Sequence, residues 1–205
     1  MTRYKVIIEY DGKNFCGWQK QRSLISIQGT IEESLYKFCG KNISVFGAGR
    51  TDKGVHAKGQ VAHFDLEEGD LEDKNYKLGK LTMGLNFYLS RACNNEISII
   101  KTSKVDNEFH SRFSAKGRKY KYTILNKQTP SPLLKDKTWR VPLSLNILLM
   151  QKASTLLIGK HDFSAFRSID CQSKSPIKTI DSINIIKNNE LIDIYVEAKS
   201  FLMNQ

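Results

Sequence analysis

The sequence predicts an α+β protein made of two subdomains, each built on a mainly antiparallel sheet. Short runs in which apolar residues alternate with period two recur along the chain, and segments with helical spacing lie between them. The 205 residues suit one large domain or two small packed ones, each able to bury a core. We place the boundary between subdomains of residues 1–106 and 107–205.

The first half is predicted to follow the order strand, helix, strand, loop, strand, helix, strand. Alternating residues predict strands over 4–10, 43–46, 60–66 and 96–101. Ile27, Ile31 and Leu35 recur at helical spacing, and Gly40 is placed to end that helix. A weaker helical pattern covers residues 76–85.

The second half repeats this alternation loosely. It opens with a predicted strand that carries Tyr120 and Tyr122 on one face. The leucines predicted to line one side of a helix are Leu145, Leu148, Leu149, Leu156 and Leu157. Residues 182–186 and 191–198 predict a hairpin across the turn-favouring Asn-Asn pair at 188–189.

Composition and charge bound the class of function. Lys+Arg 32 against Asp+Glu 21 gives a formal net charge of +11, which attracts polyanions such as a phosphate backbone, although many basic proteins bind none. Hydrophobic residues at 40% and charged residues at 26% are typical of a globular protein. No apolar run reaches the roughly 20 residues that span a bilayer, and Glu9 interrupts the N-terminal apolar stretch too early for a signal peptide. We therefore expect a cytoplasmic protein with no membrane partner.

The cysteines and histidines are too scattered to predict a metal site. A structural zinc site needs clustered ligands, and no C-x-x-C spacing occurs. We interpret the cysteines as free thiols and the histidines as hydrogen-bonding residues, with His63 on a strand face. Trp18 is interpreted as a core residue rather than a stacking platform.

The most informative segment is the glycine-rich loop of residues 47–57, GAGRTDKGVHA, which lies between two predicted strands. It is neither a P-loop nor a dinucleotide fingerprint, because it lacks a G-K-S/T ending and no helix follows it. What remains is Asp52, flanked by Arg50 and Lys53. Such an aspartate either caps its own turn or, held ionised by the guanidinium, acts as a nucleophile or base. Residue types alone leave both roles open.

Four separated blocks of the chain resemble the TruA family of tRNA pseudouridine synthases. The loop of residues 47–57, followed by QVAHF at 60–64, is similar to the family signature. The other blocks are YDG at 10–12 with GWQ at 17–19, FHSRFSA at 109–115 with RKYKY at 118–122, and HDFSAFR at 161–167. Their order and their spread over nearly the whole chain argue against an accidental match.

This resemblance implies the pseudouridine synthase fold, in which the two subdomains form a central basic cleft. It implies an isomerase that breaks the C1′–N1 bond of uridine, turns the base and rejoins it through C5, in the anticodon arm of tRNA at positions 38–40. It further implies a homodimer and a chemistry that needs no metal and no cofactor.

The resemblance also assigns roles to individual residues. Asp52 is expected to be catalytic, attacking C1′ or C6 or promoting elimination at the sugar, and Arg50 is expected to keep it ionised unless it only contacts phosphate. Tyr120 is expected to stack on the flipped target base, whereas the residues alone favour two core tyrosines, Tyr120 and Tyr122. The basic residues expected to contact RNA are Arg112, Arg118, Arg167 and Lys53.

Two departures from the family pattern qualify these expectations. LNFYLS at 85–90 stands where the family has a segment like L-N-x-x-L-P-x-D-I, and the chain stops at Gln205, where family members enter a closing segment and helix. We therefore expect a truncated member that is inactive or part of a longer chain. Two other functions stay open: an RNA-binding module without catalysis, and a base-excising hydrolase that would release free uracil.

Overall fold

The computed structural model describes residues 1–67, 78–168, 171, 173 and 175–203. It divides into two compact units, Met1–Ala115 (unit 1) and Lys116–Gln205 (unit 2). Residues 107–115, which the sequence analysis grouped with the second half, are therefore part of unit 1. Both units combine strands with a few helices, so the fold class is α+β, as predicted. Within the described residues, no helix combines the length and the apolar character needed to cross a membrane.

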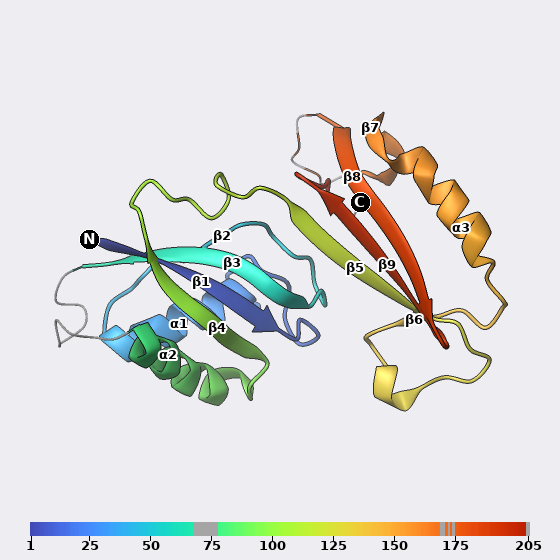
Figure 1. Cartoon of the computed structure of the whole chain (residues 1–205). Coiled ribbons are helices and arrows are strands. Elements are labelled where there is room, and N and C mark those ends of the chain that lie inside the picture. The colour runs from blue at the N-terminus through green and yellow to red at the C-terminus, as the bar shows by residue number, and fades with distance from the viewer. Residues whose placement is uncertain (68–77, 169–170, 172, 174, 204–205) are drawn as a thin grey trace. The chain divides into compact units, whose positions relative to one another are not determined.

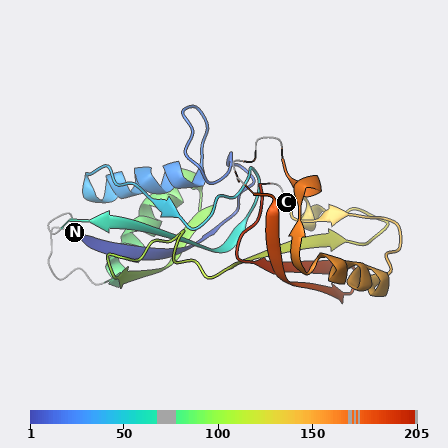
Figure 2. The same cartoon turned by 90° about the horizontal axis from the view of Figure 1, so that it is seen from above.

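Unit 1 is built on a four-stranded antiparallel sheet in the order β2-β3-β1-β4. Its strands are β1 (Thr2–Tyr10), β2 (Phe46–Gly47), β3 (Ala57–Leu66) and β4 (Ile97–Val105). Two helices, α1 (Ile27–Cys39) and α2 (Leu78–Cys93), cover one face of this sheet (Figure 1). Helix α1 runs along the strands, as Figure 2 shows from above. The predicted order of elements is confirmed.

Helix α1 lies where the apolar spacing predicts it. Its N-cap, Ser26, accepts a hydrogen bond from the amide of Gly29 at 3.2 Å. Gly40 ends the helix in a left-handed conformation, with φ of +72°, and its amide donates to the carbonyl of Tyr36 at 2.8 Å. The predicted apolar positions are buried: Ile27, Ile31 and Leu35.

Two other elements of unit 1 differ from their predicted bounds. The strand predicted over 43–46 is wrong for residues 43–45, because β2 holds only Phe46 and Gly47. The amide of Val45 donates to the Glu32 carboxylate at 3.1 Å, so a helix side chain occupies the group that a strand would pair. The helix predicted over 76–85 begins at Leu78 and continues to Cys93, while residues 76 and 77 lie outside the described residues.

The core of unit 1 lies between the sheet and the two helices. Alternate strand residues point into it together with residues of α1 and α2: Tyr4, Val6, Ile8 and Tyr10 of β1, Ala62, Phe64 and Leu66 of β3, and Leu81, Leu85 and Leu89 of α2. Trp18 is buried in the same cluster, which confirms its assignment to the core. The intervening strand residues, Arg3, His63 and Asp65 among them, face the other side of the sheet.

Unit 2 holds a five-stranded sheet in the order β6-β5-β9-β8-β7, antiparallel except for the β5–β6 pair. Its strands are β5 (Arg118–Leu125), β6 (Trp139–Arg140), β7 (Gly159–Asp162), β8 (Ile177–Asn188) and β9 (Leu191–Ala198). The predicted hairpin is confirmed as β8 and β9, which turn at Asn189 with φ of +54°. Short 3-10 turns cover Pro132–Leu134 and Ser164–Phe166.

The leucine face predicted for the helix of unit 2 is wrong except for Leu145, which packs against the core but lies just before the helix begins. Helix α3 (Ile147–Ser154) runs beside β8 (Figure 1), and its side toward the core carries Ile147 and Met150. Leu148 and Leu149 are instead 77% and 63% exposed. The α-helix ends at Ser154 and a 3-10 turn follows, which breaks the helical spacing toward residues 156 and 157.

Candidate active site

The glycine-rich loop of residues 47–57, the Asp52 loop, joins β2 to β3. Hydrogen bonds continue across its base beyond the end of β2. The amide of Ala48 donates to the carbonyl of Val61 at 2.7 Å, and the side chain of Gln60 donates to the carbonyl of Gly49 at 2.7 Å. These bonds to β3 therefore hold the part of the loop that precedes Asp52.

Thr51, directly before Asp52, is fastened to the core of unit 1. Its carbonyl accepts a hydrogen bond from the amide of Trp18 at 2.9 Å. Its hydroxyl shares a hydrogen bond with the phenol of Tyr10 at 2.8 Å. Tyr10 and Trp18 are both buried, so the backbone that leads into Asp52 is held by the core. Sequence reasoning identified the block around Tyr10 but not this contact.

Asp52 itself has an exposed side chain at the turn of the loop. The turn is closed by its carbonyl, which accepts from the amide of Val55 at 3.2 Å, and Gly54 takes up the positive φ of +80°. Within the described part of the chain, no hydrogen bond ends on the Asp52 carboxylate. The alternative in which this side chain caps its own turn is therefore wrong.

Three glycines let the opening block of the chain contact the Asp52 loop. A Cβ on Gly12 would lie 2.0 Å from the carbonyl oxygen of Val55, and one on Gly17 would lie 2.6 Å from that of Thr51. A Cβ on Gly47 would lie 2.6 Å from the ring of Trp18. No side chain fits at such distances. The YDG and GWQ blocks thus form the surface on which the Asp52 loop is seated.

Arg50 and Lys53, on either side of Asp52, are both exposed. The ion pairs among the described residues include none between the Arg50 guanidinium and the Asp52 carboxylate. Both cations thus have side chains available to solvent and lie within two residues of Asp52 in the chain. That Arg50 supports Asp52 stays a prediction.

Tyr120 lies on β5 of unit 2 with 39% of its surface exposed, and Tyr122 on the same strand is 55% exposed. The alternative of two core tyrosines is therefore wrong. The ring of Phe201 meets that of Tyr120 edge to face, with centroids 5.0 Å apart. Leu202 beside Phe201 is buried in a core cluster, so the chain after β9 supports the edge of the Tyr120 ring.

The four basic residues expected to bind RNA differ in what they already hold. Arg112 and Lys53 are exposed on unit 1. Arg118 donates to the carbonyl of Lys199. The guanidinium of Arg167 donates to the carbonyls of Cys171 and Ser173 at 2.9 and 2.8 Å. Arg118 and Arg167 therefore also hold the backbone of unit 2.

Two lysines that neighbour Tyr120 on β5 are committed to carboxylates. Lys119 pairs with Glu197 at 2.5 Å and Lys121 pairs with Asp193 at 2.8 Å. The hydrogen bond that the Lys121 ammonium donates to Asp193 raises the pKa of Lys121. The cysteines are free thiols, as expected. Among the residues that the structure describes, no cluster of His, Cys, Asp and Glu could hold a metal ion.

Comparisons with known proteins find similarity over nearly the whole chain. A family model described as "tRNA pseudouridine synthase" matches residues 6–114 and 153–205. The chain is 46% identical over 205 residues to the tRNA pseudouridine synthase A of Anaplasma phagocytophilum (strain HZ), covering 99% of this chain and 80% of that protein. Proteins of the same name from Wolbachia pipientis wMel and Ehrlichia ruminantium (strain Gardel) are 45% and 44% identical over 204 residues. Each match covers 99% of this chain, and 80% and 79% of those two proteins.

Proposed function

The chain belongs to the TruA family of tRNA pseudouridine synthases, and we propose that Asp52 is its catalytic carboxylate. The enzyme is an isomerase that converts uridine in tRNA to pseudouridine. The N1–C1′ bond of the nucleoside breaks, the base turns, and a C5–C1′ bond forms. The proton leaves C5 and N1 gains one, so the RNA keeps its mass and no electrons are exchanged.

The observation that carries this proposal is the contrast between the backbone and the side chain at Asp52. Thr51 is tied to the buried Tyr10 and Trp18, and the Asp52 carbonyl closes a turn with Val55. The carboxylate remains exposed. A reactive group on a fixed backbone is held near the geometry of attack without spending its own lone pairs on structure. Attack at C1′, attack at C6 and assistance of elimination all use a carboxylate held in this way.

The neighbouring cations complete the proposed site on unit 1. Arg50 would lie beside the Asp52 carboxylate in the RNA complex and favour its ionised form by direct Coulomb attraction. Lys53 and Arg112 would contact phosphates, which neutralises charge and fixes the register of the RNA without reading its sequence. On unit 2, Arg118 and Arg167 would contact the RNA in addition to the carbonyls that they hold.

Tyr120 is the proposed partner of the target base. A base that leaves its helical stack needs a flat surface to replace the lost stacking, which is worth about 1–3 kcal/mol per base. The exposed ring on β5, with Phe201 against its edge, offers such a surface. By family resemblance, the target uridines would be positions 38–40 of the anticodon arm, and the enzyme would act as a cytoplasmic homodimer with the two subdomains forming a basic cleft.

Asp52→Asn tests the catalytic assignment. We expect the release of tritium from a tRNA transcript labelled at C5 of its uridines to fall at least about a thousandfold, because the amide is a poor nucleophile and base. Asp181→Asn, the same change at an exposed aspartate on β8 of unit 2, is the matched control and should keep full activity. Carbodiimide mapping of pseudouridine in the product identifies the position that is modified. Full activity of Asp52→Asn would overturn the assignment.

Tyr120→Phe and Tyr120→Ala separate the ring from its hydroxyl. If stacking is the role, Tyr120→Phe should keep activity, whereas Tyr120→Ala should lose about 10- to 100-fold in kcat/KM. An equal loss in both variants would instead assign the role to the hydroxyl, for example in removing the C5 proton. Equal activity of Tyr120→Ala and the unchanged enzyme would refute contact with the base.

A further inference from the structure

The face of the unit 1 sheet opposite the helices is covered by the chain between β4 and unit 2. We call residues 106–115 the covering segment. It includes the FHSRFSA block and ends where unit 2 begins, three residues before the strand that carries Tyr120. Beneath it, His63 is buried with 2% of its surface exposed, although it belongs to the sheet face that no helix covers.

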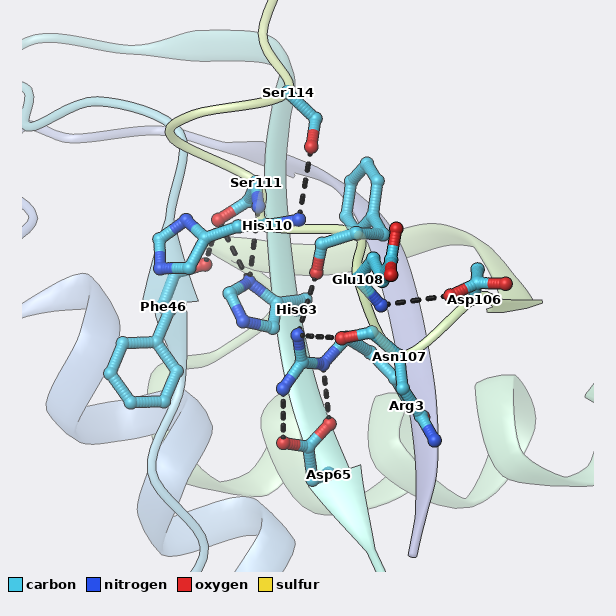
Figure 3. A network of polar contacts seen from close by, with 11 residues as sticks. Arg3, Phe46, His63, Asp65, Asp106, Asn107, Glu108, His110, Ser111 and Ser114 are labelled. Atoms are coloured by element: carbon cyan, nitrogen blue, oxygen red, sulfur yellow. Dashed lines mark hydrogen bonds and ion pairs between the residues drawn. The ribbon is translucent and has the colours of Figure 1, made fainter.

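Arg3 of β1 holds the first part of the covering segment. Its guanidinium forms a two-pronged ion pair with Asp65 across the β1–β3 ladder, at 2.7 and 2.8 Å. Its remaining nitrogen donates to the carbonyls of Asn107 and Phe109 at 2.6 and 2.8 Å (Figure 3). The planar fork of arginine suits this double task, because one edge meets a carboxylate while the other meets carbonyls.

Ser111 holds the second part through a buried chain of hydrogen bonds. Its hydroxyl lies 2.7 Å from the carbonyl oxygen of Phe46, which can only accept, and 2.9 Å from Nδ1 of His63. The amide of Ser111 also donates to Nδ1 of His63 at 3.3 Å, so this imidazole nitrogen contacts both the backbone and the hydroxyl of Ser111. Ser111 is 2% exposed, and Figure 3 shows its contacts with the His63 ring and the Phe46 carbonyl as dashed lines.

Residues 110–114, on either side of Ser111, form a compact turn. The amide of His110 donates to the Ser114 hydroxyl at 3.0 Å, and the amide of Ser114 returns to the carbonyl of His110 at 2.8 Å. The amide of Arg112 donates to Nδ1 of His110 at 3.2 Å. The backbone of Arg112 is thus fixed on both sides, while its guanidinium is exposed.

We propose that His63 and Ser111 are positioning residues that hold Arg112 in place for the phosphate backbone of the tRNA. This inference rests on the proposed role of Arg112 in RNA binding and adds the device that orders it before RNA arrives. Ordering Arg112 in the free enzyme removes an entropic cost that RNA binding would otherwise bear. If Arg112 is not ordered in advance, this cost is added equally to the bound ground state and the transition state. Losing the ordering should therefore raise KM and leave kcat unchanged.

Ser111→Ala is the direct test, with Ser34→Ala as the matched control. Ser34 is also a fully buried serine of unit 1, but its hydroxyl bonds to the Thr30 carbonyl inside α1, away from the covering segment. We expect Ser111→Ala to raise KM for tRNA about tenfold with kcat within about twofold, while Ser34→Ala leaves both unchanged. Trypsin cleavage after Arg112, followed by mass spectrometry, should also accelerate in Ser111→Ala alone.

His63 provides a second pair of variants that does not depend on Ser111→Ala folding. The side-chain amide of Asn offers both an acceptor and a donor and can take the place of Nδ1 in the hydrogen bonds to Ser111, whereas Leu cannot. His63→Asn should therefore keep the KM for tRNA and the slow rate of cleavage after Arg112. His63→Leu should raise both KM and the cleavage rate. Equal kinetics and cleavage in His63→Asn and His63→Leu would overturn the proposal, as would a Ser111→Ala enzyme that matches Ser34→Ala.

The double variant Ser111→Ala/Arg112→Ala shows whether the effect passes through Arg112. If it does, KM of the double variant should equal that of Arg112→Ala, because a residue that is absent needs no positioning. If the two substitutions instead multiply in their effects on KM, Ser111 does not act through Arg112 and the proposal is overturned. These results are independent of Asp52→Asn: an active Asp52→Asn refutes the catalytic assignment, whereas the cleavage rate after Arg112 tests the positioning device without any turnover.

Discussion

The phenol of Tyr10 and the hydroxyl of Thr51 share a hydrogen bond of 2.8 Å, which links the end of β1 to the residue before Asp52. Tyr10 is buried, so the contact lies at the edge of the unit 1 core. We expect Tyr10→Phe to destabilise the protein by about 1 kcal/mol, since the Thr51 hydroxyl loses this partner. Because the backbone before Asp52 loosens, kcat should also fall roughly tenfold.

Tritium release and urea unfolding measure the two effects of Tyr10→Phe separately. Tyr4→Phe is a suitable control, since Tyr4 is a buried tyrosine of the same strand that packs its ring on Phe64, away from the Asp52 loop. It should leave kcat unchanged. A Tyr10→Phe enzyme with normal kcat would show that the contact serves stability alone.

The close approach of Gly47 to Trp18 leads to a prediction about stability. An alanine at position 47 would place its Cβ 2.6 Å from the indole ring, which itself is buried. We expect Gly47→Ala to lower the free energy of unfolding by about 1–3 kcal/mol through overpacking. Gly79→Ala in α2, where nothing lies within 4 Å of the added Cβ, should be neutral or stabilising because alanine favours helix. Urea unfolding measures the free energy of unfolding of both variants. Equal values for Gly47→Ala and Gly79→Ala would refute the predicted clash with Trp18.

These results show which parts of the fold follow from local pattern and which do not. Helix α1 is predicted almost to the residue because its apolar spacing and its C-terminal glycine agree. In α3, by contrast, Ile147 and Met150 face the core although Leu148 and Leu149 between them are equally apolar. A run of four apolar residues has no unique face, so periodicity cannot select the buried side.

The site divides in a similar way. The position of Asp52 in its loop follows from a motif that the sequence displays, whereas the packing of that loop on the opening block appears only in the structure. The burial of His63 does not, because Ser111, which covers it, lies 48 residues further along the chain and on no regular element. Alternation on β3 identifies the face of His63, but only the fold shows what covers that face.

The burial of His63 predicts how stability depends on pH. Burial lowers the pKa of His63, and the nearby His110 and Arg3 lower it further. At pH values between this lowered pKa and the ordinary value of about 6.5, His63 is protonated in the unfolded chain and neutral in the folded chain. The stability that the neutral imidazole supports is therefore complete above about pH 6.5 and is lost as the pH falls through the lowered pKa.

His63→Asn isolates this contribution, because the amide does not titrate and keeps the hydrogen bond to Ser111. The unchanged protein should lose more free energy of unfolding than His63→Asn when the pH falls from about 7.5 to about 5. Urea unfolding at a series of pH values measures the difference between the two curves. Parallel curves over that range would mean that His63 has the same pKa in the folded and unfolded chains.

The different commitments of Arg112 and Lys121 predict how salt affects RNA binding. Arg112 is exposed, and among the described residues its guanidinium has no carboxylate partner, whereas Lys121 already pairs with Asp193 at 2.8 Å. A cation that neutralises a phosphate releases a bound counterion, so each such contact adds about 0.7–0.9 to the slope of log Kd against log salt. Arg112→Ala should therefore lower this slope by close to one contact and weaken binding of tRNA transcripts of different sequence by similar factors. Lys121→Ala should change the slope much less, because removing the lysine also frees a carboxylate that it had neutralised.

Binding titrations at several salt concentrations, in an Asp52→Asn background that prevents turnover, compare the two variants directly. Equal slopes for Arg112→Ala and the parent would remove Arg112 from the RNA interface and, with it, the reason to position it.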